Sequence, residues 1–124
     1  AGFATWHEAH QSAARALNRG VHLVAHTALE TYSVLTRLPP PHRVAAAVVQ
    51  AYLADVTSTD YLTLDARPHR ELINLLATHN VTGGAAYDAL VGSTAKAAGA
   101  TLLTRDLRAV RTYDLLQVEY ELVT

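Results

Sequence analysis

The chain has 124 residues, the size of one ordinary domain, and half of them are hydrophobic. Its formal net charge is −1 and only 17% of its residues are charged, which excludes a disordered tail and a histone-like nucleic-acid binder. The absence of cysteine excludes disulfides, thiolate nucleophiles and Cys-ligated zinc, and favours a reducing, cytoplasmic environment. No apolar run reaches membrane-spanning length, so no membrane partner is expected.

Helical and strand-like patterns alternate along the chain. The first helix begins where Thr5 and Glu8 form a capping box. Thr27 is expected to cap the second helix, which the prolines at 39–41 end. This alternation predicts βαβ units, and therefore an α/β fold whose parallel sheet has helices on both faces. In chain order, helices are predicted at 5–20, 27–38, 42–56, 67–81, 86–98 and 106–116, and strands at 21–25, 61–66, 101–105 and 118–124.

Three carboxylates fall at the carboxyl ends of the predicted strands, where open α/β sheets carry their functional crevice. Glu30 is expected in the first turn of the helix after strand 21–25, and Asp106 directly follows strand 101–105. Asp88 lies in the first turns of the helix beside them. Clustered carboxylates repel one another unless a cation lies between them, and their oxygens suit Mg²⁺ or Mn²⁺. The pattern is therefore typical of a divalent-metal site that activates water.

The alternative is that each acid acts alone at a helix N-terminus. A carboxylate there is favourable by about 0.3–1 kcal/mol through the helix dipole, and taken singly each of the three is better explained as a cap or a dipole partner. Their common location at strand ends is what favours a shared metal site.

Three segments of the sequence resemble a known family. "HTALETYSVLTRLP", "GGAAYDALVGSTAKAAGATLLTRD" and "RAVRTYDLLQVEYELV" are similar to PIN domains, and more closely to the VapC-type toxins of bacterial toxin–antitoxin systems, in particular those of mycobacteria and other actinobacteria. The resemblance covers residues 1–124 as a single PIN-like domain. It implies a three-layer α/β/α sandwich with a parallel sheet. It also implies Mg²⁺- or Mn²⁺-dependent endoribonuclease activity on RNA, a cognate VapB-type antitoxin, and homodimerisation.

The resemblance also assigns site residues. Glu30, Asp88 and Asp106 match the acidic positions of the family, and all three are expected to hold the metal. Thr104 matches the hydroxyl position before the last acid, where it could orient a water molecule or a carboxylate. These four residues are the predicted catalytic set.

One departure from the family pattern concerns the first strand, which normally carries another Asp. Residues 1–3 correspond to the region after the first helix, and the chain has no methionine. We therefore expect the parent protein to begin upstream, with the first strand absent from this chain. Its place in the sheet would be taken by the missing peptide bound as a separate chain, by a neighbouring protomer or shifted strand, or by a rearranged sheet. The chain by itself is then expected to be weak or inactive as a nuclease.

Basic and apolar side chains add expectations about partners. Arg105, Arg108 and Arg111 are the preferred candidates for binding substrate phosphates, and the last two share a helical face. A wide apolar surface on 27–38 and 42–56 is expected to be half core and half partner surface. Its members are Leu29, Tyr32, Leu35, Val44, Val48, Val49, Tyr52 and Leu53.

Two readings of function remain from the sequence. In the first, the protein is a toxin that hydrolyses RNA by metal-activated attack of water on a phosphodiester. In the alternative, it is a PIN-like binding module that engages antitoxin or RNA without cutting. A phospho-acceptor receiver domain also uses acids at strand ends, but it requires a lysine on a late strand, and the only lysine, Lys96, lies mid-helix in the predicted pattern.

Overall fold

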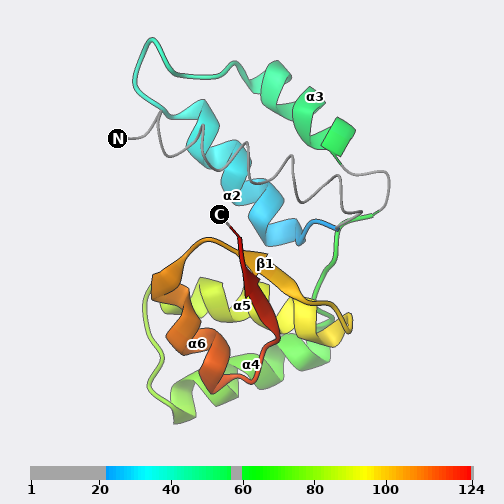
Figure 1. Cartoon of the computed structure of the whole chain (residues 1–124), viewed down its shortest axis with the longest axis vertical. Coiled ribbons are helices and arrows are strands. Elements are labelled where there is room, and N and C mark those ends of the chain that lie inside the picture. Colours follow the sequence, from blue (N-terminus) through cyan, green and yellow to red (C-terminus); the bar gives the residue numbers. More distant parts are fainter. Residues whose placement is uncertain (1–21, 57–59, 124) are drawn as a thin grey trace. The chain divides into compact units, whose positions relative to one another are not determined.

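The computed structural model describes residues 22–56 and 60–123, which belong to two compact units (Figure 1). The first unit ends at Tyr61 and the second begins at Leu62. The predicted helix at 5–20, with its capping box, lies outside the described residues. Among the described residues, no helix is long and apolar enough to cross a membrane.

The described part of the first unit consists of helices α2 (Ala25–Thr36) and α3 (Ala46–Val56). The predicted strand at 21–25 is wrong: of its described residues only Val24 forms a bridge, and α2 begins directly after it. A short apolar run does not distinguish a strand from the start of a buried helix. The predicted cap Thr27 is also wrong, because it lies inside α2, where its carbonyl accepts the Thr31 hydroxyl at 2.8 Å.

Helices α2 and α3 pack against each other through a small apolar core. Leu35, Leu38 and Val49 are buried in it. Helix α2 ends at Thr36, before the triple proline, as predicted. The helix predicted at 42–56 begins only at Ala46, because residues 42–45 are not helical. The core half of the predicted apolar surface is confirmed, because four of its eight members lie in or against this core. Leu29 and Val48 are exposed, and the partner role of the other half stays a prediction.

The second unit has the order helix, helix, strand, helix, strand. The predicted strand at 61–66 is wrong, since only Leu62 forms a bridge. The remaining elements agree with prediction to within a few residues at their ends, except that the last helix begins as a 3₁₀ turn. They are α4 (Ala66–Thr78), α5 (Ala85–Ala97), β1 (Leu102–Thr104), η1 (Leu107–Ala109), α6 (Val110–Leu115) and β2 (Tyr120–Leu122).

Strands β1 and β2 form a parallel pair, as the alternation of elements predicted. Leu102 lies opposite Tyr120 and Thr104 opposite Leu122. Parallel strands need a crossover connection, and η1 with α6 provides it. The Tyr120 ring packs against the Tyr113 ring of α6, with centroids 5.8 Å apart. Partial burial, followed by the hydrogen bond and charge of Asp114, raises the pKa of the Tyr120 hydroxyl.

Helices α4, α5 and α6 end in the same way, with one residue in the left-handed conformation followed by a reversal of the chain. These residues are Asn80, Gly99 and Gln117, with φ values of 52°, 68° and 58°. The following residue donates its N–H to a carbonyl five positions back at 2.9 Å, in the pairs Val81–Leu76, Ala100–Ala95 and Val118–Tyr113. This Schellman arrangement satisfies carbonyls that the helix end leaves without partners.

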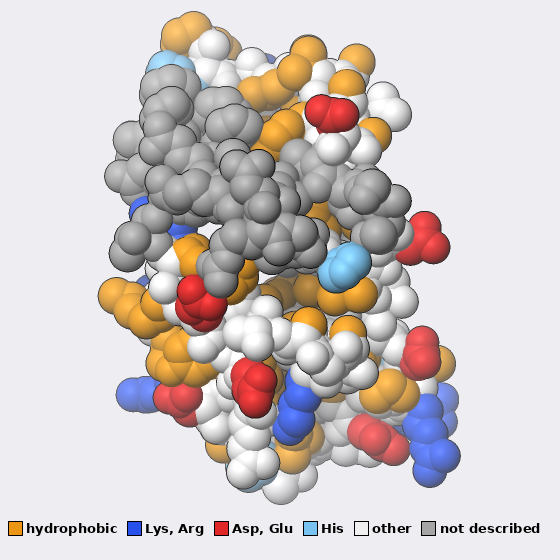
Figure 2. Space-filling model, turned by 45° about the vertical axis from the view of Figure 1, so that its right-hand side comes forward, with side chains coloured by type: hydrophobic (Ala, Val, Ile, Leu, Met, Phe, Trp, Pro, Cys, Tyr) orange, Lys and Arg blue, Asp and Glu red, His pale blue; other side chains and the backbone are white. Residues whose placement is uncertain are grey.

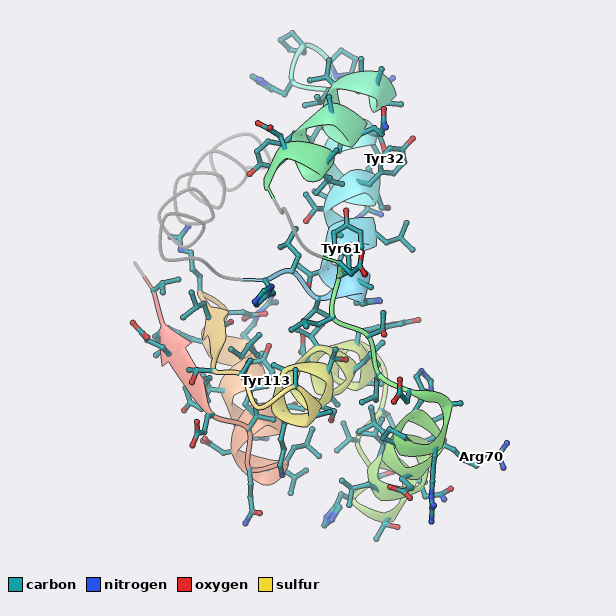
Figure 3. The ribbon with its side chains drawn as sticks, turned by 90° about the vertical axis from the view of Figure 1, so that its right-hand side faces the viewer. Tyr32, Tyr61, Arg70 and Tyr113 are labelled. Carbon is teal, nitrogen blue, oxygen red and sulfur yellow. The ribbon has the colours of Figure 1, made fainter. Side chains whose placement is uncertain are left out.

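Helices α5 and α6 run parallel and in close contact. Lys96, in the last turn of α5 rather than mid-helix, donates from Nζ to the carbonyl of Leu116 just after α6, at 2.9 Å. One turn earlier, Gly92 of α5 is buried beside Tyr113 of α6. Figure 3 labels Tyr113. A Cβ at Gly92 would lie 3.0 Å from the Tyr113 ring and 3.1 Å from Val118. Glycine is therefore required here for the two helices to approach.

We expect Gly92→Ala to lower the free energy of unfolding by about 1 kcal/mol. Alanine gains about 1 kcal/mol in helix propensity, but overpacking a buried contact costs about 1–3 kcal/mol, and Tyr113 is too enclosed to move away. Urea denaturation measures the change. In a Tyr113→Leu background, where the ring is gone, the same substitution should be neutral or stabilising. If Gly92→Ala lowered the free energy of unfolding equally in the wild type and in the Tyr113→Leu variant, the Gly92–Tyr113 contact would not be its cause.

We expect Gln117→Gly to raise the free energy of unfolding by about 0.5 kcal/mol. The left-handed conformation costs a non-glycine residue about 1–2 kcal/mol, and the greater freedom of glycine in the unfolded chain offsets part of the gain. Thermal denaturation provides the measurement. Gln117→Val is the opposing control, because a β-branched side chain tolerates this conformation worst, and it should destabilise the protein.

Candidate functional site

Asp106 lies where the sequence predicted it, just beyond the carboxyl end of β1, and it caps η1. Its Oδ1 accepts the backbone N–H of Arg108 at 2.9 Å. Its own N–H donates to the hydroxyl of Thr104, the last residue of β1, at 3.1 Å. Thr104 thus holds the Asp106 backbone, and Arg108 holds the carboxylate. The predicted role of Thr104 in orienting a water molecule or a carboxylate stays a prediction.

Asp88 is in the first turn of α5, as predicted. It is half-buried, and one turn further along the helix lies Gly92, the residue in contact with α6. Residues four apart share a helix face, so the Asp88 carboxylate continues the buried stripe at the edge of the core. Its environment is therefore partly shielded from water on the side of α6.

The parallel packing of α5 and α6 brings Asp88 and Asp106 to one end of the second unit. Lys96 contacts residue 116 and Gly92 contacts residue 113, so the contacts advance in the same order along both helices. We therefore expect Asp88, one turn before Gly92, to lie toward the start of α6. Asp106 precedes residue 109 by one 3₁₀ turn, about 6 Å along the axis. We therefore infer that the two carboxylates lie near the same end of the helix pair, at the carboxyl end of β1.

Glu30 belongs to the first unit, whereas Asp88 and Asp106 belong to the second. The prediction that it lies in the first turn of its helix is wrong, because α2 begins at Ala25 and the first turn of α2 contains no acid. The Glu30 side chain is 63% exposed, and its Oε2 is 3.5 Å from Nε2 of His26, one turn earlier in α2.

The candidate phosphate-binding arginines are all exposed. The Arg108 side chain is 94% exposed, and its Nε is 3.5 Å from Asp106 Oδ1, which is a weak contact in water. Arg108 lies in η1 and Arg111 in α6, so the helix face predicted for them spans a junction between two helix types. On the face shown in Figure 2, acidic and basic side chains are interspersed rather than gathered in one basic surface.

Sequence reasoning missed the direct contact between Arg108 and Asp106. The available signal was the spacing Asp-x-Arg directly after a strand, because an aspartate commonly accepts the backbone N–H two residues ahead. Within the described ranges, no group of three or more His, Asp or Glu residues is arranged to hold a metal ion. Magnesium needs only one or two protein carboxylates when waters and substrate phosphate complete its shell.

The family of the chain follows from comparison with known proteins. The family model described as the PIN domain matches residues 1–115. The chain belongs to the PIN domain family. Ribonuclease VapC40 of Mycobacterium tuberculosis, in two strains, is 73% identical over the whole chain and 92% of its own length. Ribonuclease VapC27 of M. tuberculosis is 42% identical over 82% of the chain and 73% of its own length. No solved structure matches.

Family membership agrees with the α/β architecture of the described residues. The described residues form helices and a small parallel sheet, so the predicted α/β fold class is confirmed. The PIN match begins at residue 1 and ends at residue 115, in the last turn of α6. It therefore includes Asp88, Thr104 and Asp106, together with the α5–α6 contact that relates them.

We expect Thr104→Val to destabilise the protein by about 1 kcal/mol, since valine leaves the Asp106 N–H without its acceptor. Thr104→Ser keeps the oxygen and should behave like the wild type. Denaturation gives the stability of each variant, and hydrogen exchange of the Asp106 amide reports the contact itself. Equal exchange rates in the valine and serine variants would contradict this role.

Proposed function

We propose that this protein is a metal-dependent endoribonuclease, the toxin of a VapC-type toxin–antitoxin pair acting in the bacterial cytoplasm. The observation that carries the proposal is 73% identity, over every residue of the chain, to a protein named Ribonuclease VapC40. Asp106 directly after β1 and Asp88 in the first turn of α5 support it, because carboxylates near the carboxyl end of a strand suit divalent-metal hydrolysis.

The donor set fits Mg²⁺ or Mn²⁺. Asp88 and Asp106 offer hard carboxylate oxygens, which these ions prefer, and the first turn of α5 favours negative charge. A bound ion would supply a Lewis acid and lower the pKa of a water ligand. Glu30 of the first unit is a further proposed metal ligand, and its exposed carboxylate is paired only weakly with His26.

The residues around the acids would position the substrate. Thr104 holds the Asp106 backbone through its hydroxyl, which keeps the carboxylate at the end of β1. Arg105, Arg108 and Arg111 would bind RNA phosphates as charge-assisted donors. Because Arg108 is nearly fully exposed and held only by a 3.5 Å contact, it can turn from Asp106 to a phosphate at little cost.

Partner contacts are assigned to the first unit. Leu29 and Val48 are exposed on α2 and α3, beyond what the local core buries. We propose that a VapB-type antitoxin segment and the second copy of a homodimer cover apolar side chains of these helices. An amphipathic helix is the natural occupant of such a surface. Co-purification with a VapB-type antitoxin tests this assignment.

We expect Asp88→Asn and Asp106→Asn each to lower RNA cleavage by at least about 100-fold, the scale on which an electrostatic group at a reaction centre acts. Asparagine caps a helix as well as aspartate does, so the stability of the Asp106→Asn variant should change little. Cleavage ends are mapped in total RNA with Mg²⁺, with Mn²⁺ and with chelator.

Asp65→Asn is the matched control, because Asp65 also precedes a helix of the second unit but makes no side-chain capping bond. It should cleave like the wild type. If no RNA is cut under any metal condition while RNA or antitoxin still binds, the protein is a binding module and the nuclease proposal fails.

A further inference from the structure

Tyr87, the residue directly before Asp88, is a large side chain that the core does not use. It lies in the first turn of α5 and is 58% exposed. The residues before it are small, and a Cβ added at Gly83 or Gly84 would meet nothing within 4 Å. A partly exposed aromatic side chain thus lies in the same helical turn as a candidate metal-binding acid.

The backbone around Tyr87 is fixed rather than available to a ligand. The Ala86 N–H donates to the Gly83 carbonyl at 3.0 Å, and the Tyr87 N–H to the Gly84 carbonyl at 3.1 Å. These N–H groups of the helix start are therefore already occupied and do not form an anion site. What this turn exposes to solvent is more than half of the Tyr87 side chain.

The position of the ring relative to Asp88 follows from helix geometry. Successive residues are about 100° apart around a helix, and Asp88 continues the stripe that faces α6. Tyr87 therefore flanks the carboxylate on the side away from the buried residue Ala89. A nucleotide whose phosphate met a metal ion bound by these acids would have its base near this flank.

Single-stranded RNA is recognised largely by stacking of unpaired bases on aromatic side chains. We propose that Tyr87 is a specificity-determining residue that stacks on a base next to the scissile phosphate. This inference rests on the proposed ribonuclease function, because it is the location of the catalytic acids that makes RNA the partner. Stacking tolerates every base, so Tyr87 would select an unpaired nucleotide rather than one particular base.

The test measures RNA binding and cleavage separately, using the full chain. Tyr87→Ala should weaken binding of single-stranded homopolymer RNA, with metal chelated, by about 5- to 100-fold, whereas Tyr87→Phe should stay within about 2-fold. Ile73→Ala is the matched control, because Ile73 is 55% exposed on α4 of the same unit, and it should bind like the wild type. Cleavage by Tyr87→Ala should fall through KM more than through kcat.

A second measurement identifies the stacked base. In an RNA that the wild type cuts, single nucleotides near the cut are replaced one at a time by abasic residues. At one position, the abasic substitution should weaken RNA binding by the wild type about as much as Tyr87→Ala does. The same abasic RNA should bind the Tyr87→Ala variant no more weakly than the intact RNA does. If the losses in binding from the abasic substitution and from Tyr87→Ala add up at every position, Tyr87 does not stack on a base.

Other outcomes are distinguishable. If Tyr87→Ala binds and cleaves RNA normally but no longer retains the antitoxin, Tyr87 is a protein-contact residue and the inference is wrong. If the wild type cuts no RNA but Tyr87→Ala still loses binding to the homopolymers, the stacking role stands and the nuclease proposal fails. If the wild type binds no single-stranded RNA, the inference falls.

Discussion

The close approach of α5 and α6 at Gly92 is the contact on which the second unit depends. Glycine costs about 1 kcal/mol of helix propensity relative to alanine. This cost is offset because the Tyr113 ring packs directly against the backbone at Gly92. Tyr113 in turn packs on Tyr120 of β2, so the same ring ties the helix pair to the sheet. Lys96 closes the far end of the pair with a hydrogen bond to Leu116.

The relative position of the two acids is a consequence of that contact. Asp88 and Asp106 are separated by a helix end, a left-handed turn at Gly99 and the whole of β1. Neither the turn nor the strand alone determines how close the two side chains lie. We infer that the register between α5 and α6 determines it, because the contacts at Lys96 and Gly92 place Asp88 toward the start of the η1–α6 segment. A substitution that shifts this register would separate the carboxylates without touching either one.

The sequence predicted the second unit better than the first, and the physical reasons differ. Helix α5 and strand β1 were predictable because Gly99 separates a small-residue helix from a β-branched and leucine run. The segments at 21–25 and 61–66 carry the same local pattern as strands, yet each keeps only a bridge residue, since periodicity in a short apolar run is ambiguous. Gln117 in a left-handed turn has no signal in its residue type. The register between α5 and α6 depends on tertiary contacts, which cannot be predicted from the local pattern of a single sequence.

The sequence left open whether each acid is a helix cap or a site residue, and at Asp106 these roles are compatible. The cap uses Oδ1, which accepts from both the backbone and the side chain of Arg108. A carboxylate has about four lone-pair positions on its two oxygens, so capping through one oxygen orients the group without exhausting it as a ligand. The N–H bond from Asp106 to Thr104 fixes the backbone from the other side. A cap built in this way pre-organises the carboxylate: the same hydrogen bonds that begin η1 hold Asp106 at the end of β1, where a metal and a phosphate would require it.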